Sequence, residues 1–211
     1  PSHAKPEMKT PDRVAIIGGG TMGAAIAYAF LNSGVEVAVL ETDVDGMVRA
    51  SANIETLISA GLSSGRIDEN AANAHRNQLT LTTDYQDLGS VDLAIEAVFE
   101  DDNVKQEVLR SLEVALPPDA VIATNTSYLD VNILAGALAD PSRLVGLHFF
   151  APAHIMKLLE IVKGELASPK ALAMGYAVAK LLGKIPVVAG VCDGFIGNRI
   201  LAPVSYTHLT L

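Results

Sequence analysis

The chain has 211 residues, half of them apolar, and its 15 basic and 24 acidic side chains give a formal net charge of −9. The acidic balance and the lack of a basic cluster argue against a nucleic-acid-binding protein. No apolar run approaches the roughly 20 residues that span a bilayer, so we expect no membrane span.

One cysteine, Cys192, is present, so no intrachain disulfide forms. No secretory signal precedes the first apolar segment. We therefore expect a reducing compartment, either the cytoplasm of a bacterium or another intracellular space. A buried, unreactive thiol is the expected state of Cys192.

The chain begins with polar, Pro-rich residues, and we interpret 1–12 as a linker. Residues 13–18 predict a buried strand, 21–32 a helix and 35–40 a second strand, which together make a βαβ unit. Strands are expected further on at 79–81, 91–97, 120–123, 144–149, 156–162 and 185–189. Helices are expected at 43–59, 103–116, 130–138 and 169–182, with a helical hairpin or excursion at 61–78.

This alternation of strands and helices predicts an α/β protein of the Rossmann-like type, with a doubly wound, mostly parallel sheet. We expect one such domain over 13–190. A further helix begins near residue 194, so 191–203 is interpreted as the start of a second, truncated domain.

The glycine-rich stretch after the first strand spells G-x-G-x-x-G with Gly18, Gly20 and Gly23, and encloses Thr21 and Met22. Following a strand and opening a helix, it predicts a dinucleotide cradle. The first glycine permits the tight turn, the second lets the backbone approach a pyrophosphate, and the third lets helix and strand pack closely. A glycine-rich turn without a ligand is the alternative.

Glu41 ends the second strand, where an acidic side chain accepts from both ribose hydroxyls and repels a 2′-phosphate. This favours NAD over NADP. Asp43 competes for the role if the strand ends elsewhere, and a solvated strand-end carboxylate is the third interpretation.

Two polar residues, His148 and Glu160, interrupt the apolar stretch 147-LHFFAPAHIMKLLEIV-162. Burying such groups costs free energy unless they are paired. Pro152 between them suggests a turn that brings two strands side by side. His148 taken alone would more readily be a satisfied core histidine.

Five stretches in order, VAIIGGGTMGAAIA, DLAIEAVFED, ATNTSYLD, GLHFFAPAHIMKLLEIV and DGFIGNRIL, resemble the 3-hydroxyacyl-CoA dehydrogenases of fatty-acid β-oxidation. The resemblance covers residues 12–203. It is strongest to the dehydrogenase part of multifunctional enzymes that also carry an enoyl-CoA hydratase.

The resemblance implies roles for the matching residues and an acyl-CoA substrate. His148 matches the base that takes the proton of the 3-hydroxyl, and Glu160 matches the carboxylate paired with it. Ser127 matches a serine that binds the substrate oxygen at C3, and Asn198 an asparagine that supports the thioester end and the histidine. The alternatives are a turn-forming hydroxyl for Ser127 and a surface amide for Asn198.

Glu100 and Lys105 match positions that contact the nicotinamide-ribose side of the cofactor, although a solvated ion pair is the alternative. Ala151 departs from single-function members, which carry asparagine there, and resembles the multifunctional ones. Asp92 and Asp193 lack ligand neighbours, so no metal is expected.

Two other function classes share parts of this pattern. Dehydrogenases of the 3-hydroxyisobutyrate type share the glycine motif but use a lysine base, which the pair His148 and Glu160 argues against. A non-catalytic, crystallin-like protein on the same fold would need neither of them.

Family members continue with a helical domain after the stretch that matches NRIL, and this domain carries most of their dimer contact. Residues 204–211 depart from the family, and we interpret them as an artefactual tail, with real divergence as the alternative. We expect the present chain to bind NAD weakly and to turn over poorly, and the full-length form to be a homodimer or fused to a hydratase. Acyl chain length is not predicted.

Overall fold

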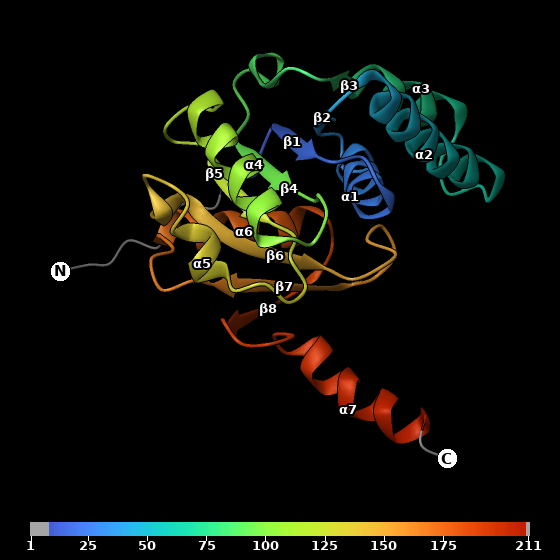
Figure 1. Ribbon diagram of the computed structural model, residues 1–211. Coiled ribbons are helices and arrows are strands. Elements are labelled where there is room, and N and C mark those ends of the chain that lie inside the picture. The colour runs from blue at the N-terminus through green and yellow to red at the C-terminus, as the bar shows by residue number, and fades with distance from the viewer. Residues whose placement is uncertain (1–8, 210–211) are drawn as a thin grey trace.

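The structure, a computed structural model, describes residues 9–209, with an eight-stranded sheet at its centre (Figure 1). The strands lie in the order β3-β2-β1-β4-β5-β6-β7-β8. All neighbours from β3 to β6 are parallel, β7 is antiparallel to β6, and β8 is parallel to β7. The strands are β1 (Arg13–Ile17), β2 (Glu36–Leu40), β3 (Leu79–Thr82), β4 (Leu93–Glu96), β5 (Val121–Thr124), β6 (Leu144–Phe149), β7 (Leu158–Lys163) and β8 (Ile185–Gly190).

Helices cover both faces of this sheet, which confirms the predicted doubly wound, mostly parallel architecture. Val14 and Ile16 of β1 pack with α1, α2, α3 and α6, whereas Ala15 and Ile17 pack with α4 and α5. This alternation follows from the two-residue period of a strand buried on both faces. The helices are α1 (Thr21–Leu31), α2 (Val44–Ser63), α3 (Glu69–Gln78), α4 (Asp102–Ala115), α5 (Val131–Ala135), α6 (Pro169–Leu181) and α7 (Gly197–Leu209).

Aspartates define the beginnings of several helices. Asp43 accepts a hydrogen bond from the Gly46 backbone N–H at 2.7 Å and so starts α2, and Asp68 caps α3 in the same way through Ala71 at 2.8 Å. A carboxylate at this position satisfies an N–H group that has no partner inside the helix. The segment 61–78, expected to be a helical hairpin or excursion, is the end of α2, a turn and α3.

Three elements are clearly shorter than the sequence predicts, and one is the strand expected over 91–97, which is the four-residue β4. The helix expected over 130–138 is the five-residue α5, which ends before Gly136. The strand expected from residue 156 begins at Leu158, because the Met156 carbonyl is held by the Lys184 ammonium at 2.7 Å instead of joining the sheet. Two short 3₁₀ helices, Tyr85–Leu88 and Pro141–Arg143, were not expected.

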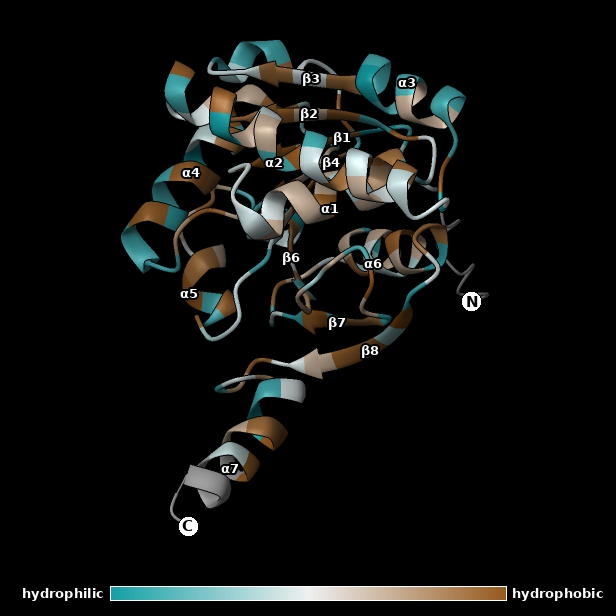
Figure 2. Cartoon of the chain, turned by 90° about the vertical axis from the view of Figure 1, so that its right-hand side faces the viewer, coloured by the Kyte–Doolittle hydropathy of each residue, from teal (hydrophilic) through white to brown (hydrophobic). Residues whose placement is uncertain are grey.

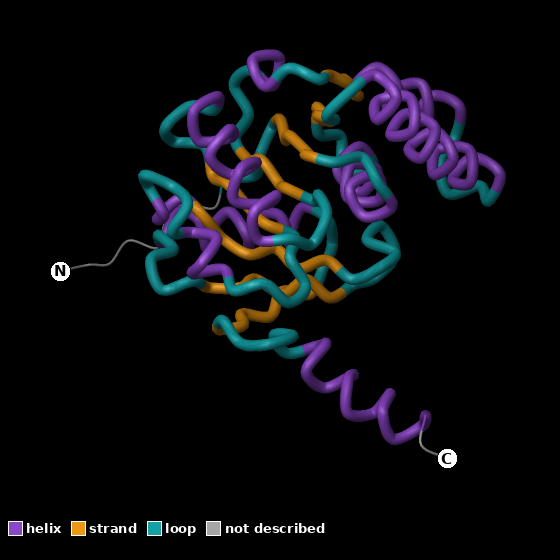
Figure 3. The backbone as a smooth tube through the Cα atoms, viewed as in Figure 1, coloured by secondary structure: helices purple, strands orange, loops and turns teal. Residues whose placement is uncertain are grey.

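Two parts of the molecule project from the body of the sheet. The α2–α3 hairpin extends on the side of β3, and α7 leaves the opposite edge beyond β8 (Figure 3). Polar residues dominate α3, whereas apolar residues recur along α7 (Figure 2). Ile200 and Leu201 of α7 are exposed. No helix within residues 9–209 combines the length and the apolarity that a bilayer span requires.

The position of β1 sets where a ligand can bind. β2 lies on one side of β1 and β4 on the other, so the direction of strand addition reverses between them. In open α/β sheets a crevice forms at this point, outside the carboxyl ends of the strands. The glycine turn follows β1 and Glu96 ends β4, at this same edge.

Candidate active site

The glycine turn after β1 is packed at two points and open at one. Gly18 has φ +92°, a conformation that L side chains rarely adopt. A Cβ on Gly23 would lie 1.7 Å from the Gly18 carbonyl oxygen, and one on Gly19 would lie 2.2 Å from the Ala50 Cβ. A Cβ on Gly20 would meet no atom within 4 Å. The open position sits at the start of α1, where unpaired N–H groups favour an anion.

Glu41 follows β2 and lies against the glycine turn. Its Oε1 accepts a hydrogen bond from the Gly19 backbone N–H at 2.5 Å, and Asn53 of α2 donates to the Gly19 carbonyl at 3.0 Å. Asp43 is engaged as the cap of α2. Of the two acidic candidates, Glu41 is therefore the one beside the cradle.

The antiparallel hairpin of β6 and β7 places His148 directly opposite Glu160 in the sheet register. The His148 Nδ1 and the Glu160 Oε2 are 2.6 Å apart, and the two residues are 4 % and 0 % exposed. A carboxylate this close to Nδ1 selects the tautomer whose proton sits on Nδ1, so Nε2 is the basic nitrogen of the neutral ring. The contact that the family resemblance implied is present, between two strands that lie side by side as the spacing suggested.

The other carboxylate oxygen of Glu160 is also satisfied. Its Oε1 accepts hydrogen bonds from the backbone N–H groups of Ile196 at 2.9 Å and Gly197 at 2.8 Å, where α7 begins. Phe195, directly before them, is buried and has φ +48°, a conformation uncommon for a residue with a side chain. The turn into α7 is thus shaped around Glu160.

Aromatic rings enclose His148. The Phe150 ring centre lies 4.4 Å from the imidazole centre, and the Phe195 ring centre lies 5.7 Å from it. A Cβ on Gly197 would come within 2.6 Å of the Phe150 ring. The absence of a side chain at 197 therefore lets Phe150 lie against the histidine.

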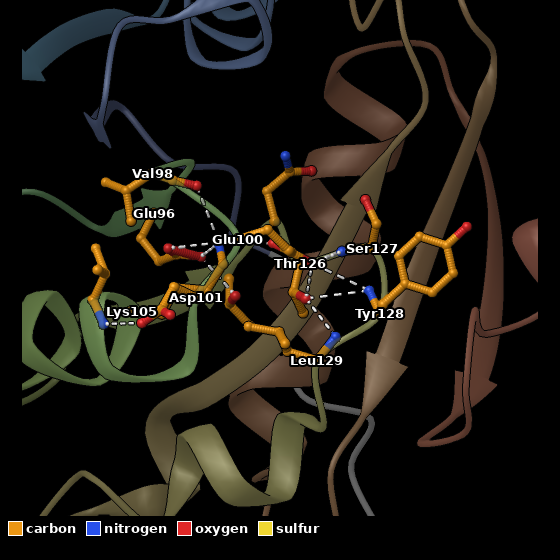
Figure 4. Close-up of polar contacts among 12 residues, drawn as sticks. Glu96, Val98, Glu100, Asp101, Lys105, Thr126, Ser127, Tyr128 and Leu129 are labelled. Atoms are coloured by element: carbon orange, nitrogen blue, oxygen red, sulfur yellow. Dashed lines mark hydrogen bonds and ion pairs between the residues drawn. The ribbon is translucent and has the colours of Figure 1, made fainter.

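Ser127 lies in the turn after β5, and the Glu100 carboxylate holds that turn (Figure 4). The Glu100 Oε1 accepts from the Thr126 hydroxyl at 2.5 Å, the Ser127 N–H at 2.7 Å and the Tyr128 N–H at 3.2 Å. Burial alone would raise the pKa of Glu100, but the Thr126 hydrogen bond and the Lys105 charge outweigh it and hold that pKa below its usual value.

Lys105 lies behind Glu100 and is fully buried. Its ammonium contacts both oxygens of Glu96, at 2.7 and 2.9 Å, and the Glu100 Oε2 at 3.2 Å. Glu96 is itself 0 % exposed, and burial raises its pKa against the opposing effect of Lys105. The solvated ion pair considered for Glu100 and Lys105 is therefore wrong for Lys105.

Two asparagines connect these parts. The Asn198 side chain on α7 donates to the Ser127 carbonyl at 3.4 Å, and the Asn125 side chain accepts from the Phe149 N–H at 3.0 Å. The turn that presents Ser127 is thereby tied to the strand that carries His148. Ser127, His148, Glu160 and Asn198 form one connected group, with Glu100 and Lys105 behind it.

The profile of one protein family, described as "3-hydroxyacyl-CoA dehydrogenase, NAD binding domain", matches residues 13–192. The chain belongs to this family. Its fold agrees with that of the FadB2 crystal structure from M. tuberculosis, with a TM-score of 0.93 and 34 % identity, covering 96 % of this chain and 72 % of that one. The dehydrogenase part of multifunctional enzyme 1 from C. elegans gives a TM-score of 0.79 and 35 % identity, covering 87 % of this chain and 42 % of that one.

Curated relatives of this NAD-binding domain are longer proteins. A peroxisomal fatty acid beta-oxidation multifunctional protein from Oryza sativa is 39 % identical over 198 residues, which are 93 % of this chain and 27 % of the relative. The fatty acid oxidation complex subunit alpha of Pseudomonas entomophila is 37 % identical over 191 residues, 90 % of this chain and 27 % of the relative. The chain thus spans about a quarter of the length of these relatives.

Sequence reasoning missed Glu96, the carboxylate that pairs with Lys105. Its signal was a charged residue at the end of an otherwise apolar strand, LAIE. The expectation for Cys192 is wrong, because this thiol is partly exposed and contacts the Phe195 carbonyl oxygen. Within residues 9–209 no three His, Cys, Asp or Glu side chains are arranged to hold a metal ion.

Proposed function

We propose that this chain is the NAD-binding part of an enzyme that oxidises (S)-3-hydroxyacyl-CoA to 3-oxoacyl-CoA. The observation that carries the proposal is the buried pair of His148 and Glu160, whose side chains are 2.6 Å apart. His148 lies near the carboxyl end of β6, at the edge of the sheet where the glycine turn follows β1. Membership of the family supports the same reaction, and so do the names of the curated relatives.

His148 acts as the general base in this proposal. With its Nδ1 proton held by Glu160, the imidazole takes the proton of the 3-hydroxyl at Nε2. The Glu160 charge then stabilises the imidazolium that forms. Rigid rings of Phe150 and Phe195 beside the imidazole restrict its rotation, which favours a fixed proton-transfer geometry.

Ser127 and Asn198 orient the substrate. Ser127 stands in the turn after β5 with its backbone fixed by Glu100, so its hydroxyl is available to the oxygen at C3. Asn198 reaches the same turn from α7. Both roles come from the matching family positions, and the 3.4 Å contact of Asn198 with the Ser127 carbonyl supports them.

The residues of the cradle fit NAD. Open space over Gly20 at the start of α1 suits the pyrophosphate, and the Glu41 carboxylate beside the turn suits the ribose hydroxyls. Thr21 and Met22 follow in the first turn of α1. Bound NAD supplies the acceptor for the hydride from C3.

Because the relatives are multifunctional by name, we propose that the chain serves as the dehydrogenase part of a longer protein that acts on acyl-CoA. We expect the chain alone to be slow. The start of α7 contacts Glu160, but Ile200 and Leu201 further along this helix are exposed and do not hold it against the body of the sheet.

The test has two measurements. The rate of acetoacetyl-CoA reduction by NADH is measured from the loss of NADH absorbance, and NAD affinity is measured by fluorescence. His148→Gln is expected to reduce the rate about 10²- to 10⁴-fold and to leave NAD affinity unchanged. A variant as fast as the parent would refute the assignment of the base. If the parent chain is itself too slow, the parent sequence and His148→Gln are compared in the full-length protein.

A further inference from the structure

We propose that Glu96 is a positioning residue, and that a relay of three charges, the buried Glu96 and Lys105 and the exposed Glu100, holds the turn that presents Ser127. The catalytic part of this inference rests on the proposed function, since it assumes that Ser127 meets the substrate. The structural part, that the relay fixes the turn, stands without it.

The inner end of the relay is sealed from water. Glu96 is the last residue of β4 and is 0 % exposed, and the Lys105 side chain is 1 % exposed. Besides Lys105, the Thr124 hydroxyl at the end of β5 donates to the Glu96 Oε1 at 2.7 Å. Glu96 therefore fixes both the ammonium of Lys105 and the last residue of the strand that leads into the turn.

The outer end of the relay faces the substrate turn. Lys105 contacts the Glu100 Oε2, and the Glu100 Oε1 accepts from Thr126, Ser127 and Tyr128 (Figure 4). Each carboxylate oxygen of Glu100 thus has a different task. One is held by the buried ammonium, and the other gathers the hydroxyl and N–H groups of the turn.

The arrangement is more than a stabilising ion pair. Burying the charges of Glu96 and Lys105 brings a desolvation cost that packed apolar side chains would avoid, so stability alone does not explain the arrangement. One ammonium is shared by two carboxylates, leaving a net negative charge. That charge is directed at two backbone N–H groups, and hydrogen bonds to an ionised acceptor are the stronger and more directional ones.

The charges around Glu100 determine how it titrates. Lys105 on α4 faces it, and Glu96 on β4 lies behind Lys105. Asp101, its neighbour in the chain, is engaged by the N–H groups of Asn103 and Val104 at the start of α4. An N–H that donates to a carboxylate changes its proton resonance when that carboxylate is protonated, so the Ser127 amide reports on Glu100.

The first experiment follows the Ser127 and Tyr128 amide resonances by NMR while the pH is lowered from neutral. Lys105→Met removes the cation beside Glu100, and the pH midpoint at which both amide resonances change is expected to rise by about one unit. Glu96→Gln removes a competing negative charge, so the same midpoint is expected to fall. A side chain that only fills space would not give shifts of opposite sign.

Two further variants keep this test decisive. Glu96→Gln combined with Lys105→Met removes both buried charges together, so it folds even if a single change strands one of them. Because the two changes act in opposite directions and Lys105 is the nearer group, its midpoint is expected to rise, but by less than in Lys105→Met. Glu107→Gln, an exposed change on the same helix, is the matched control and is expected to leave the midpoint in place. Midpoints that do not move in any variant would overturn the relay.

The second experiment measures acetoacetyl-CoA reduction in the full-length protein. Glu96→Gln is expected to lower kcat about tenfold while NADH affinity stays within about twofold of the parent. A moved midpoint with unchanged kcat would overturn the catalytic part of the inference. Failure of the proposed function itself would appear separately, as a His148→Gln variant with full activity.

Discussion

Single residues of the glycine turn are required for different physical reasons, and substitutions separate them. Gly23→Ala is expected to destabilise the fold by about 1–3 kcal/mol, because its Cβ would lie 1.7 Å from the Gly18 carbonyl oxygen. Gly20→Ala is expected to fold normally, since its Cβ meets no atom within 4 Å, but to weaken NAD binding where the pyrophosphate approaches.

Urea unfolding and NAD-dependent fluorescence measured on both variants test this pair. Equal loss of stability in the two variants would contradict the packing argument. Unchanged NAD affinity in Gly20→Ala would contradict the position assigned to the pyrophosphate.

At the same scale, Glu160 uses two oxygens as acceptors, and glutamine cannot replace both. In Glu160→Gln the single oxygen is expected to stay with the N–H groups of Ile196 and Gly197. The amide NH₂ then donates to the His148 Nδ1, which moves the ring proton to Nε2. We expect a folded protein that binds NAD and reduces acetoacetyl-CoA about 10²- to 10⁴-fold more slowly.

Nitrogen-15 NMR of the histidine ring reads the tautomer directly in this variant. A proton still on Nδ1, or a rate equal to that of the parent, would show that the carboxylate does not select the tautomer. Glu165→Gln, a change of the same kind at the exposed end of the same hairpin, is the control.

Among the elements, the turn between β6 and β7 depends on one buried lysine. The Lys184 ammonium donates to the carbonyls of Ala153 at 2.6 Å and Met156 at 2.7 Å, and burial lowers its pKa. Lys184→Met leaves both carbonyls without this donor and is expected to cost about 1–3 kcal/mol. Lys180→Met, exposed at the end of α6, is expected to change stability by less than about 0.5 kcal/mol. Urea unfolding of both variants is the measurement.

Elements whose partners are close in sequence were predictable. Spacing and Pro152 suggested the turn that brings the two strands side by side, whereas the pairing of His148 with Glu160 was implied by the family resemblance. The contact between Glu96 and Lys105 also spans few residues, but it depends on how α4 crosses β4 and on whether the lysine points inward. Chain periodicity does not determine that packing.

For the molecule as a whole, the alternation of strands and helices was sufficient to predict a doubly wound, mostly parallel sheet, whereas it did not predict the packing of the parts around Glu160. The N–H groups of Ile196 and Gly197 reach Glu160 across 36 and 37 residues. Nothing in the local pattern of GFIGNR marks those groups as its partners. The positive φ of Phe195, which directs them inward, is a tertiary constraint that overrides local preference.

Two histidines from different parts of the molecule pack against the same tyrosine, and both have shifted pKa values. His75 on α3 and His154 after β6 both pack edge-on against Tyr28 of α1, with ring centres 5.9 and 5.5 Å away. Neither Nδ1 has a hydrogen-bond partner within the described residues. Burial lowers the pKa of both imidazoles, with Arg76 adding to the effect at His75 and Arg66 and Lys184 at His154.

A lowered pKa in the folded state means that the unfolded chain binds protons first as the pH falls. The stability contributed by these histidines is therefore complete above the unfolded pKa of 6.5 and is lost as the pH falls below it. We expect the free energy of unfolding, from urea titrations at a series of pH values, to decrease below that point. His75→Gln combined with His154→Gln removes both groups and is expected to flatten this dependence. An unchanged slope in the double variant would assign the acid sensitivity to other groups.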